Sequence, residues 1–472
     1  MSRIKFGTSG WRAKIADEFT FANVRLVVQS IADYIDSKRL KEKGVIVGYD
    51  TRFLSEKFAE EASSIIAGNG IKGYFSLRDV PTPVLSYEIL RRKTAGAINF
   101  TASHNPPEYG GIKFSPDWGG PALPEVTGYI EERINTISIN NIATLPLHEA
   151  RNRGLLENID MRMPYLTDLK EKIDLSAIKK SKLKIAVDLL YGTARDYLDT
   201  ILRENGCEIS VLHGYRDPYF GGMTPDPSEK NLSELRGFVK KGDYDLGLAT
   251  DGDADRFGII DKDGIFIEPN YIIALLMDYF VRERGWKGDV ARTVATTHLV
   301  DSVARYHGRY VHETPVGFKY IGDLISKDKL IIGGEESAGL SIKGHIPEKD
   351  GILACLLVAE MVAIEGKTIS QILNDLYRKI GKIVTKRINI TLTEGMKNTL
   401  EERLKDVPPF FDGLRVREVV KIDGIKYILE DNSWILIRTS GTEPVVRIYA
   451  EAGDENRLEV LLNAGKRFIM GG

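Results

Sequence analysis

Three aspartates at alternate positions, followed by an arginine, form the sequence DGDADR at Asp251, Asp253, Asp255 and Arg256. In an extended strand alternate side chains lie about 6.6 Å apart, whereas the oxygen ligands of Mg²⁺ converge to about 2.1 Å from the ion. The segment must therefore curl, and Gly252 permits this. Because three neighbouring carboxylates repel one another, we predict a divalent cation or cationic partners here, with a turn of solvated aspartates as the alternative. An EF-hand loop is excluded, since its sixth and twelfth positions would be arginine and lysine instead of glycine and glutamate.

A single serine, Ser103, stands in the sequence TASHNPP. It follows the apolar run AGAINF, which predicts a buried strand, and it precedes a turn that Pro106 and Pro107 impose. Loops at the carboxyl ends of strands face the crevice where α/β proteins bind ligands, so Ser103 is a candidate reactive group. A serine that caps a turn is the alternative. The neighbouring His104 is a candidate acid or base, or an ordinary loop residue.

A third motif lies between the strands SWILI and VVRIYAEA, and its polar residues are Arg438, Ser440, Gly441 and Thr442, with Arg447 on the second strand. An arginine fork, two hydroxyls and a glycine that exposes backbone N–H groups are what a phosphate needs. A polar hairpin loop is the alternative.

Two further loops carry polar groups that suit a sugar phosphate. Glu335 and Ser337 follow the strand KLIIG, and carboxylates accept hydrogen bonds from vicinal hydroxyls such as those of a sugar ring. A helix N-cap is the alternative interpretation of this segment. Lys319, in the sequence TPVGFKY, is predicted on a glycine loop, where it is either a ligand or a solvated lysine.

Two other patterns carry no chemistry. Residues 68–73 match G-x-G-x-x-G but follow a helix and open a strand, which is the reverse of a dinucleotide site and predicts a helix C-cap. The seven histidines lack the spacing of a zinc site.

The segments that must position these motifs alternate between strands and helices up to about residue 380. Helices are predicted at 55–68, 83–92, 124–137, 164–173, 194–204, 231–241, 270–284, 299–306 and 351–364. The runs FGIID and GIFIE are expected as a hairpin that opens the third block of this pattern. After residue 380 strands dominate, apart from a helix at 394–405 and a terminal helix, which favours an α+β domain with an antiparallel sheet.

Composition limits the functional classes. The 472 residues are 43% hydrophobic and 28% charged, which is typical of a folded multidomain protein. A net charge of -2 gives no global field for nucleic acid or an anionic membrane, so any anionic ligand must be held locally. Cys207 and Cys355 lie in apolar runs and are expected as core thiols. Because the amino-terminal segment lacks an apolar core and the most apolar helix contains Glu360, we expect a cytoplasmic protein without a membrane span.

Taken together, TASHNPP, DGDADR, GEESAG and RTSGTEP, with GTSGWRA at the front, resemble the site loops of the α-D-phosphohexomutases in order and spacing. The resemblance covers nearly the whole chain. It implies three tandem related α/β domains with mixed sheets and a C-terminal α+β domain with an antiparallel sheet, arranged around a central cleft. The expected boundaries are 1–150 for the phosphoserine-loop domain, 151–257 for the metal-loop domain, 258–378 for the sugar-loop domain and 379–472 for the phosphate-loop domain.

The resemblance also implies roles for individual residues. Ser103 would be the phosphoserine, and it would hold Mg²⁺ together with Asp251, Asp253 and Asp255. Arg12 and Lys113 match basic positions that assist transfer, with Arg256 orienting the same site. The substrate-binding residues would be Lys319, Glu335, Ser337, Arg438, Ser440, Gly441, Thr442 and Arg447. The general base stays open among His104, Lys113 and Arg12.

The implied activity is a mutase that interconverts glucose 1-phosphate and glucose 6-phosphate, with Mg²⁺ and glucose 1,6-bisphosphate as the intermediate and activator. GEESAG with TPVGFKY resembles the phosphoglucomutase branch, whereas phosphomannomutases more often carry a histidine where this chain has Gly339. Phosphomannomutase and phosphoglucosamine mutase activities are alternatives with the same mechanism. From other classes, a sugar-phosphate phosphatase and a non-catalytic sugar-phosphate binding protein remain as alternatives. The expected partners are therefore small sugar phosphates, not nucleic acid or membrane.

Overall fold

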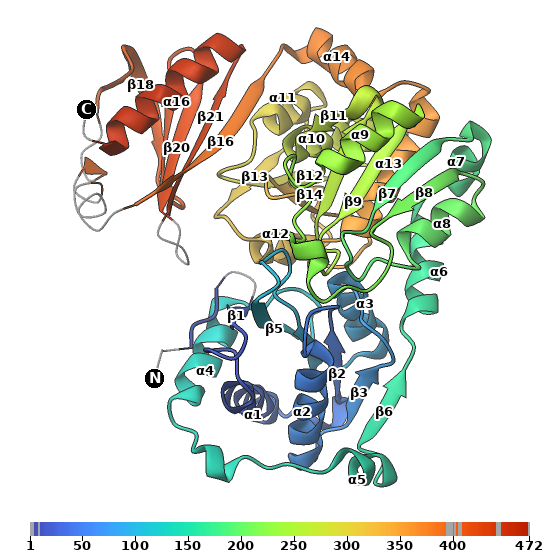
Figure 1. The fold of residues 1–472 in the computed structure, drawn as a ribbon. Helices are drawn as coiled ribbons and strands as arrows, with labels where there is room; N and C mark the ends of the chain where they lie inside the picture. The colour runs from blue at the N-terminus through green and yellow to red at the C-terminus, as the bar shows by residue number, and fades with distance from the viewer. Residues whose placement is uncertain are drawn as a thin grey trace.

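The structure is a computed structural model that describes residues 4–7, 10–392, 400, 403–404, 408–439 and 445–470. Four sheets follow one another along the chain, three of them mixed and flanked by helices and the last one antiparallel (Figure 1). This confirms the predicted fold class.

The first sheet has the strand order β1-β5-β4-β2-β3-β6, in which β5 alone is antiparallel to the other strands. Its strands are β1 (Trp11–Lys14), β2 (Val45–Tyr49), β3 (Gly73–Ser76), β4 (Gly96–Phe100), β5 (Tyr109–Pro116) and β6 (Leu156–Ile159). Its helices are α1 (Phe21–Ser37), α2 (Ser55–Gly68), α3 (Thr82–Arg92), α4 (Pro124–Ile134) and α5 (Leu147–Asn152).

Strands β1 and β5 were not expected from the sequence, where glycines predicted turns. The glycines of β5 instead allow close packing: a Cβ on Gly110 would lie 2.4 Å from the Phe19 ring, and one on Gly111 would lie 2.3 Å from the Thr101 carbonyl oxygen. The two glycines therefore let β5 pack closely between β1 and β4. Lys113 of β5 lies opposite Asn99, near the carboxyl end of β4.

The second sheet has the order β11-β10-β9-β7-β8 and the third the order β13-β12-β14-β15. The second contains β7 (Lys184–Asp188), β8 (Glu208–Leu212), β9 (Leu246–Thr250), β10 (Phe257–Asp261) and β11 (Ile265–Ile267), with α6 (Arg162–Lys172), α7 (Leu175–Ser181), α8 (Leu198–Glu204) and α9 (Ser233–Gly242). The third contains β12 (Asp289–Thr293), β13 (Val311–Thr314), β14 (Leu330–Glu335) and β15 (Gly339–Ile342), with α10 (Pro269–Arg282), α11 (Leu299–Tyr306), α12 (Phe318–Ser326), α13 (Gly351–Glu365) and α14 (Ile369–Ile380).

The predicted FGIID–GIFIE hairpin exists, but it does not open the third block. Its strands β10 and β11 extend the second sheet, because β10 pairs antiparallel with β9. Strand β6 likewise joins the first sheet through β3, although the sequence suggested a break near residue 150. The second sheet therefore begins after β6 and ends at Ile267.

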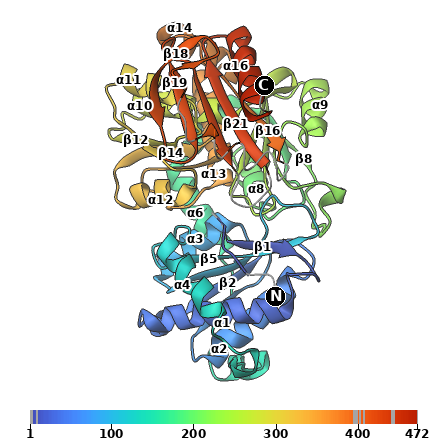
Figure 2. The same ribbon diagram turned by 90° about the vertical axis from the view of Figure 1, so that its left-hand side faces the viewer.

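The C-terminal sheet is antiparallel throughout, in the order β16-β21-β20-β19-β18-β17. It comprises β16 (Val384–Thr391), β17 (Phe410–Phe411), β18 (Leu414–Val420), β19 (Ile425–Leu429), β20 (Trp434–Thr439) and β21 (Val445–Ala452), followed by α16 (Glu455–Met470). Figure 2 shows this sheet face-on, in front of the third sheet and its helices. Trp434, Leu436 and Tyr449 pack there against Val294 and Ala295. The helix predicted at 394–405 lies largely outside the described residues.

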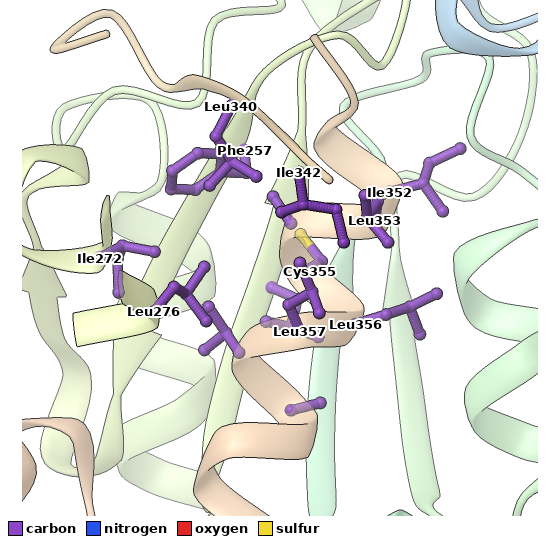
Figure 3. Close-up of a cluster of buried hydrophobic side chains, with 14 of the residues drawn as sticks. Phe257, Ile272, Leu276, Leu340, Ile342, Ile352, Leu353, Cys355, Leu356 and Leu357 are labelled. Atoms are coloured by element: carbon purple, nitrogen blue, oxygen red, sulfur yellow. The ribbon is translucent and has the colours of Figure 1, made fainter. Parts of the chain in front are cut away.

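Helix α13 is the centre of the largest core. It is buried from Gly351 to Val362, as expected of a helix that is apolar on all sides. Figure 3 shows its side chains packed between residues of α10, β10 and β15, among them Leu276, Phe257 and Leu340. Cys355 lies in this core, and both Cys355 and Cys207 are buried free thiols, as predicted. The second and third sheets thus share one core, which fixes their loops relative to each other.

Within the described part of the chain, no helix is long and apolar enough to cross a membrane. Glu360, which interrupts the apolar run of α13, is 1% exposed and accepts hydrogen bonds from Tyr279 and Arg284.

Candidate active site

Ser103 lies at the carboxyl end of β4, as predicted, and is 1% exposed. Its backbone adopts a left-handed conformation with φ of +52°, and its N–H donates to Thr101 Oγ1 at 2.8 Å. The hydroxyl donates to Asp251 Oδ2 at 2.8 Å, and Oγ lies 3.2 Å from His104 Nδ1. The candidate nucleophile therefore faces the acidic loop of the next unit, about 150 residues further along the chain.

The acidic loop joins β9 to β10 and curls as the sequence required. Arg256 N donates to Asp251 Oδ1 at 3.0 Å, and Ala254 turns the chain with φ of +60°. A Cβ on Gly252 would lie 2.8 Å from the Ser103 carbonyl oxygen, and one on Gly351 would lie 2.1 Å from the Arg256 carbonyl oxygen. Glycine at these two positions lets the loops of three units meet.

The three aspartates are buried, and one oxygen of each lies within 4.8 Å of the others. Asp253 accepts from Lys113 Nζ at 2.6 Å and from Thr82 Oγ1 at 2.5 Å, and Asp255 accepts from Lys113 at 2.7 Å. Asp253 Oδ1 and Asp255 Oδ1 are buried without a hydrogen-bond partner. Buried carboxylate oxygens that converge and lack partners fit a Mg²⁺ ion, which prefers hard oxygen ligands.

The charges of this loop shift its acidities in opposite directions. Burial, together with Asp253 and Asp255, raises the pKa of Asp251 well above its ordinary value. Burial would also raise the pKa of Asp255, but Lys113, Lys349 and Arg256 outweigh it and hold that pKa below its ordinary value. Asp251 and Asp255 therefore hold protons with different affinity, although they belong to the same loop.

Three basic groups surround Ser103. Lys113 comes from β5, and Arg12 from β1 donates to Asn105 Oδ1 at 2.7 Å, next to the serine loop. Burial, and then the charge of Arg256, lowers the pKa of Arg12 to about 10. Arg256 Nε lies 3.9 Å from Asp255 Oδ1. Arg12, Lys113 and Arg256 therefore lie around the serine loop and the acidic loop, and their roles in transfer stay predictions.

His104 differs from these cations. Burial, followed by the charges of Arg256 and Arg12, lowers its pKa well below the ordinary value. These causes disfavour the imidazolium form, so a neutral imidazole lies beside Ser103 Oγ.

Glu335 ends β14 and is 6% exposed, and Ser337 Oγ donates to its Oε1 at 2.7 Å. Burial raises the pKa of Glu335. The adjacent Glu336 accepts instead from Thr293 Oγ1 at 3.0 Å, at the end of β12. Of the two neighbouring carboxylates, Glu335 is the one that lies with the cations of the site.

Lys349, which was not among the predicted residues, joins the acidic loop to the loop that contains Glu335 and Ser337. Its Nζ lies 3.4 Å from Asp255 and 2.7 Å from Glu348, and its stem passes Gly339, where a Cβ would be only 2.3 Å from Lys349 Cδ. Asp255 and Glu348 raise the pKa of this lysine although burial opposes them. Its sequence signal was its place next to Asp350, the residue that caps α13.

Thr82 is a second residue that sequence reasoning missed. From the first turn of α3, its backbone N–H and its hydroxyl both bind Asp253, at the carbonyl oxygen and at Oδ2. Asn99 Nδ2 donates to Thr82 Oγ1 at 3.0 Å, so this contact is itself oriented. Such contacts fix the direction of a metal-binding carboxylate.

Lys319 lies in the first turn of α12, not on the glycine loop where it was expected, because Gly317 with φ of +127° already begins the helix. Burial lowers its pKa. Its ammonium lies 5.3 Å from the centre of the Tyr320 ring, on the same helix. The assignment of Lys319 to the substrate therefore stays a prediction.

In the C-terminal sheet, Arg438 of β20 and Arg447 of β21 are direct cross-strand partners. Like charges opposite each other are unfavourable unless an anion or a carboxylate lies between them. Asp423 is such a carboxylate, because it accepts hydrogen bonds from Arg438 Nε at 2.8 Å and from Val316 N at 3.1 Å. It thereby joins the C-terminal domain to the segment before Lys319. The predicted residues Ser440, Gly441 and Thr442 lie outside the described residues.

The chain matches four family models in succession. They are described as phosphoglucomutase/phosphomannomutase alpha/beta/alpha domains I, II and III, at residues 3–141, 163–264 and 268–380, and the C-terminal domain of the same family at residues 388–464. Together these models span the chain and contain each motif described above.

Similar proteins carry three different activity names. A phosphoglucomutase of Komagataeibacter xylinus is 31% identical over 95% of this chain and 87% of its own length. A protein of Methanosphaera stadtmanae assigned as a phosphoglucosamine mutase is 31% identical over 98% of both chains. The crystal structure of a Thermus thermophilus protein assigned as a phosphomannomutase is 32% identical and superposes with a TM-score of 0.86 over 100% of both chains. These matches, and the order of the four family domains, show that the chain belongs to the phosphoglucomutase/phosphomannomutase family of phosphohexomutases.

Proposed function

We propose that the protein is a phosphoglucomutase that interconverts glucose 1-phosphate and glucose 6-phosphate through a phosphoserine at Ser103. The observation that carries this proposal is the 2.8 Å contact between Ser103 Oγ and Asp251 in a cluster whose other aspartates hold partnerless oxygens. A hydroxyl that meets both a cation site and several basic side chains is suited to carry a phosphoryl group.

In the proposed cycle the bond between phosphorus and Ser103 Oγ breaks as a bond to a hydroxyl of the hexose monophosphate forms. The resulting glucose 1,6-bisphosphate reorients, and its other phosphoryl group returns to Ser103. When bound by Asp251, Asp253 and Asp255, Mg²⁺ supplies positive charge that offsets the phosphate oxygens. Lys113, Arg12 and Arg256 place further cations around the same hydroxyl.

The accepting hydroxyl must lose a proton. Of the three candidates for this role, His104 is the one whose charged form is disfavoured below neutral pH, whereas Arg12 keeps a pKa of about 10 and Lys113 is held between two carboxylates as a cation. We assign the base to His104 as part of the proposal. Lys349 remains protonated, so it is suited to bind substrate oxygens or to donate a proton.

The preference for glucose rests on the sugar loop. Glu335 and Ser337 offer a carboxylate and a hydroxyl to ring hydroxyls, and Lys349 fills the space next to Gly339 where phosphomannomutases more often carry a histidine. A larger side chain at Gly339 would displace that lysine. We assign the binding of the distal phosphate to Arg438, Arg447, Ser440, Gly441 and Thr442. Lys319 is included in this proposal because it follows Val316, which contacts Asp423, the partner of Arg438.

Two measurements test this function. Intact-protein mass spectrometry after incubation with glucose 1,6-bisphosphate is expected to show one added phosphate that is absent in Ser103→Ala. Loss of the nucleophile is expected to lower mutase turnover by about 10⁴-fold or more. Undiminished turnover by Ser103→Ala would refute the mechanism.

Substrate choice is tested by comparing kcat/KM for glucose 1-phosphate, mannose 1-phosphate and glucosamine 1-phosphate. A preference of about tenfold, or about 1.4 kcal/mol, for mannose or glucosamine would replace glucose with that sugar in the proposal. Steady release of inorganic phosphate without isomer formation would instead indicate a phosphatase.

A further inference from the structure

One buried arginine outside the predicted site touches the serine loop more extensively than any predicted site residue does. Arg52 follows β2, and its side chain is fully buried. Its Nη2 donates to the carbonyl oxygens of Ser103 and Asn105, each at 2.6 Å, and its Nη1 to those of Pro106 and Tyr109 at 2.7 and 3.1 Å. Its Nε donates to Asp50 Oδ2 at 3.1 Å. The five N–H donors of a guanidinium are thereby all engaged.

The loop needs this cation to keep its shape. Four backbone carbonyl groups converge on one point, and their negative ends would repel one another without a positive group between them. The same loop holds Ser103 in a left-handed conformation with φ of +52°, which a residue other than glycine adopts only when its surroundings impose it. A lysine could donate at most three hydrogen bonds from one point and could not reproduce the planar fork.

Neighbouring groups fix the guanidinium itself. Asp50 Oδ1 accepts from Arg52 N at 3.0 Å and from Ser55 Oγ at 2.8 Å, so the carboxylate cannot turn away. The Phe220 ring of the second unit lies 4.9 Å from the centre of the guanidinium. Arg52 is thus held in place by one side chain from each of the two units that meet at Ser103.

We propose that Arg52 is a positioning residue for phosphoryl transfer: it sets the backbone of Ser103 so that Oγ points at Asp251, although it touches no reacting atom itself. This inference rests on the proposed function of Ser103. Arg52 should therefore affect the rate of phosphoryl transfer and not the binding of the sugar or of the distal phosphate. The reason is that its contacts given above are with the serine loop, Asp50 and Phe220.

The test compares Arg52→Lys with Arg284→Lys. Arg284 is a matched control, because its guanidinium also binds a carboxylate, Glu360, and a backbone carbonyl, that of Lys172, and also stacks on an aromatic ring, Trp286 at 5.0 Å. A misplacement of a reacting group by about 1 Å can lower the reaction rate about 10²-fold. Arg52→Lys is therefore expected to lower kcat for glucose 1-phosphate about 10²-fold, with KM changed less than about threefold. Arg284→Lys is expected to lower the melting temperature similarly and to keep kcat.

Hydrogen exchange of residues 101–111 provides a second measurement, and faster exchange confined to this loop is expected in Arg52→Lys. If that variant does not fold, Asp50→Asn keeps the shape of the carboxylate and removes its charge, and it is expected to lower kcat severalfold at an unchanged KM.

A kcat of Arg52→Lys equal to that of Arg284→Lys, or of Asp50→Asn equal to that of wild type, would overturn the role of Arg52. If the wild-type protein shows no mutase turnover, the proposed function is wrong. In that case hydrogen exchange still tests Arg52 on its own: an unchanged exchange rate of residues 101–111 in Arg52→Lys would show that Arg52 does not position the serine loop.

Discussion

The acidic cluster and the interdomain cluster, two of the buried groups of charged residues in the described part of the chain, are built differently. The acidic cluster contains Asp251, Asp253, Asp255, Lys113 and Arg256, and two of its carboxylate oxygens have no hydrogen-bond partner. The interdomain cluster lies between the third unit and the C-terminal sheet and contains Lys426, Glu451, His298, Arg292 and Glu313.

In the interdomain cluster the charged atoms are paired. Glu451 accepts from Trp434 Nε1 at 2.7 Å, from the His298 backbone N–H at 3.1 Å and from the Thr297 hydroxyl. Lys426 donates to the Val294 carbonyl oxygen at 3.0 Å and lies 2.7 Å from His298 Nε2. Buried polar groups that have hydrogen-bond partners need no further ligand, whereas the partnerless oxygens of Asp253 and Asp255 mark a place for one.

The largest expected effect that tests this comparison comes from Asp251→Asn. The change removes one ligand and one of three repelling charges, and it is expected to lower mutase kcat/KM by about 10³-fold. The metal-free melting temperature should not fall, and the rise that Mg²⁺ produces in wild type should disappear. Asp188→Asn is the matched control, because Asp188 is a fully buried aspartate at the end of β7 that binds His213 instead. The comparison fails if Asp251→Asn still shows the Mg²⁺-dependent rise.

The next effect is on stability. Lys113→Met leaves Asp253 and Asp255 without their shared cation, which is expected to lower the free energy of unfolding by about 3 kcal/mol, as measured by urea titration. Mg²⁺ should restore much of this loss, because it can neutralise the same oxygens. A loss that Mg²⁺ does not reduce would mean that the cluster is not a cation site.

The interdomain cluster should instead respond to pH. Burial raises the pKa of Glu451 to about 7, so its protonated form is favoured in the folded protein. The stability that this group contributes is fully present below its unfolded pKa of about 4.3 and is lost as pH rises through about 7. Wild type should therefore lose stability relative to Glu451→Gln between pH 5.5 and pH 8, as measured by urea unfolding at each pH. A difference between the two proteins that stays constant with pH would contradict this assignment.

The smallest expected effect concerns the contact between domains at Asp423. Asp423→Asn weakens the bonds to Arg438 and Val316 without removing either cation of the predicted phosphate site. Because a contact with the non-reacting phosphate is made in the ground state and the transition state alike, KM for glucose 1-phosphate should rise about threefold at an unchanged kcat. Asp431→Asn, which loses a contact with Arg457 in the same domain, is the control. An equal rise in KM for both variants would show a general effect on the domain.

Much of the site was predictable because its reactive residues lie in short sequence motifs. The spacing of Asp251, Asp253 and Asp255 with Gly252 required a curled loop, and the structure contains one. The strand before Ser103 and the helix of α13 followed from their apolar patterns. Strand β5 was missed, since the fit of Gly110 and Gly111 against Phe19 and Thr101 depends on residues distant in sequence.

By itself the sequence determined the residue types, the order of the motifs and the period of each helix and strand, because these depend on neighbouring residues. Only the tertiary structure decided which groups meet. In the folded protein Ser103 donates to Asp251, Lys349 packs against Gly339, and four backbone carbonyl groups accept hydrogen bonds from Arg52. Contacts of this kind join residues separated by 10 to about 150 positions, and they form only when the packing of whole sheets fixes the loops, which no local pattern encodes.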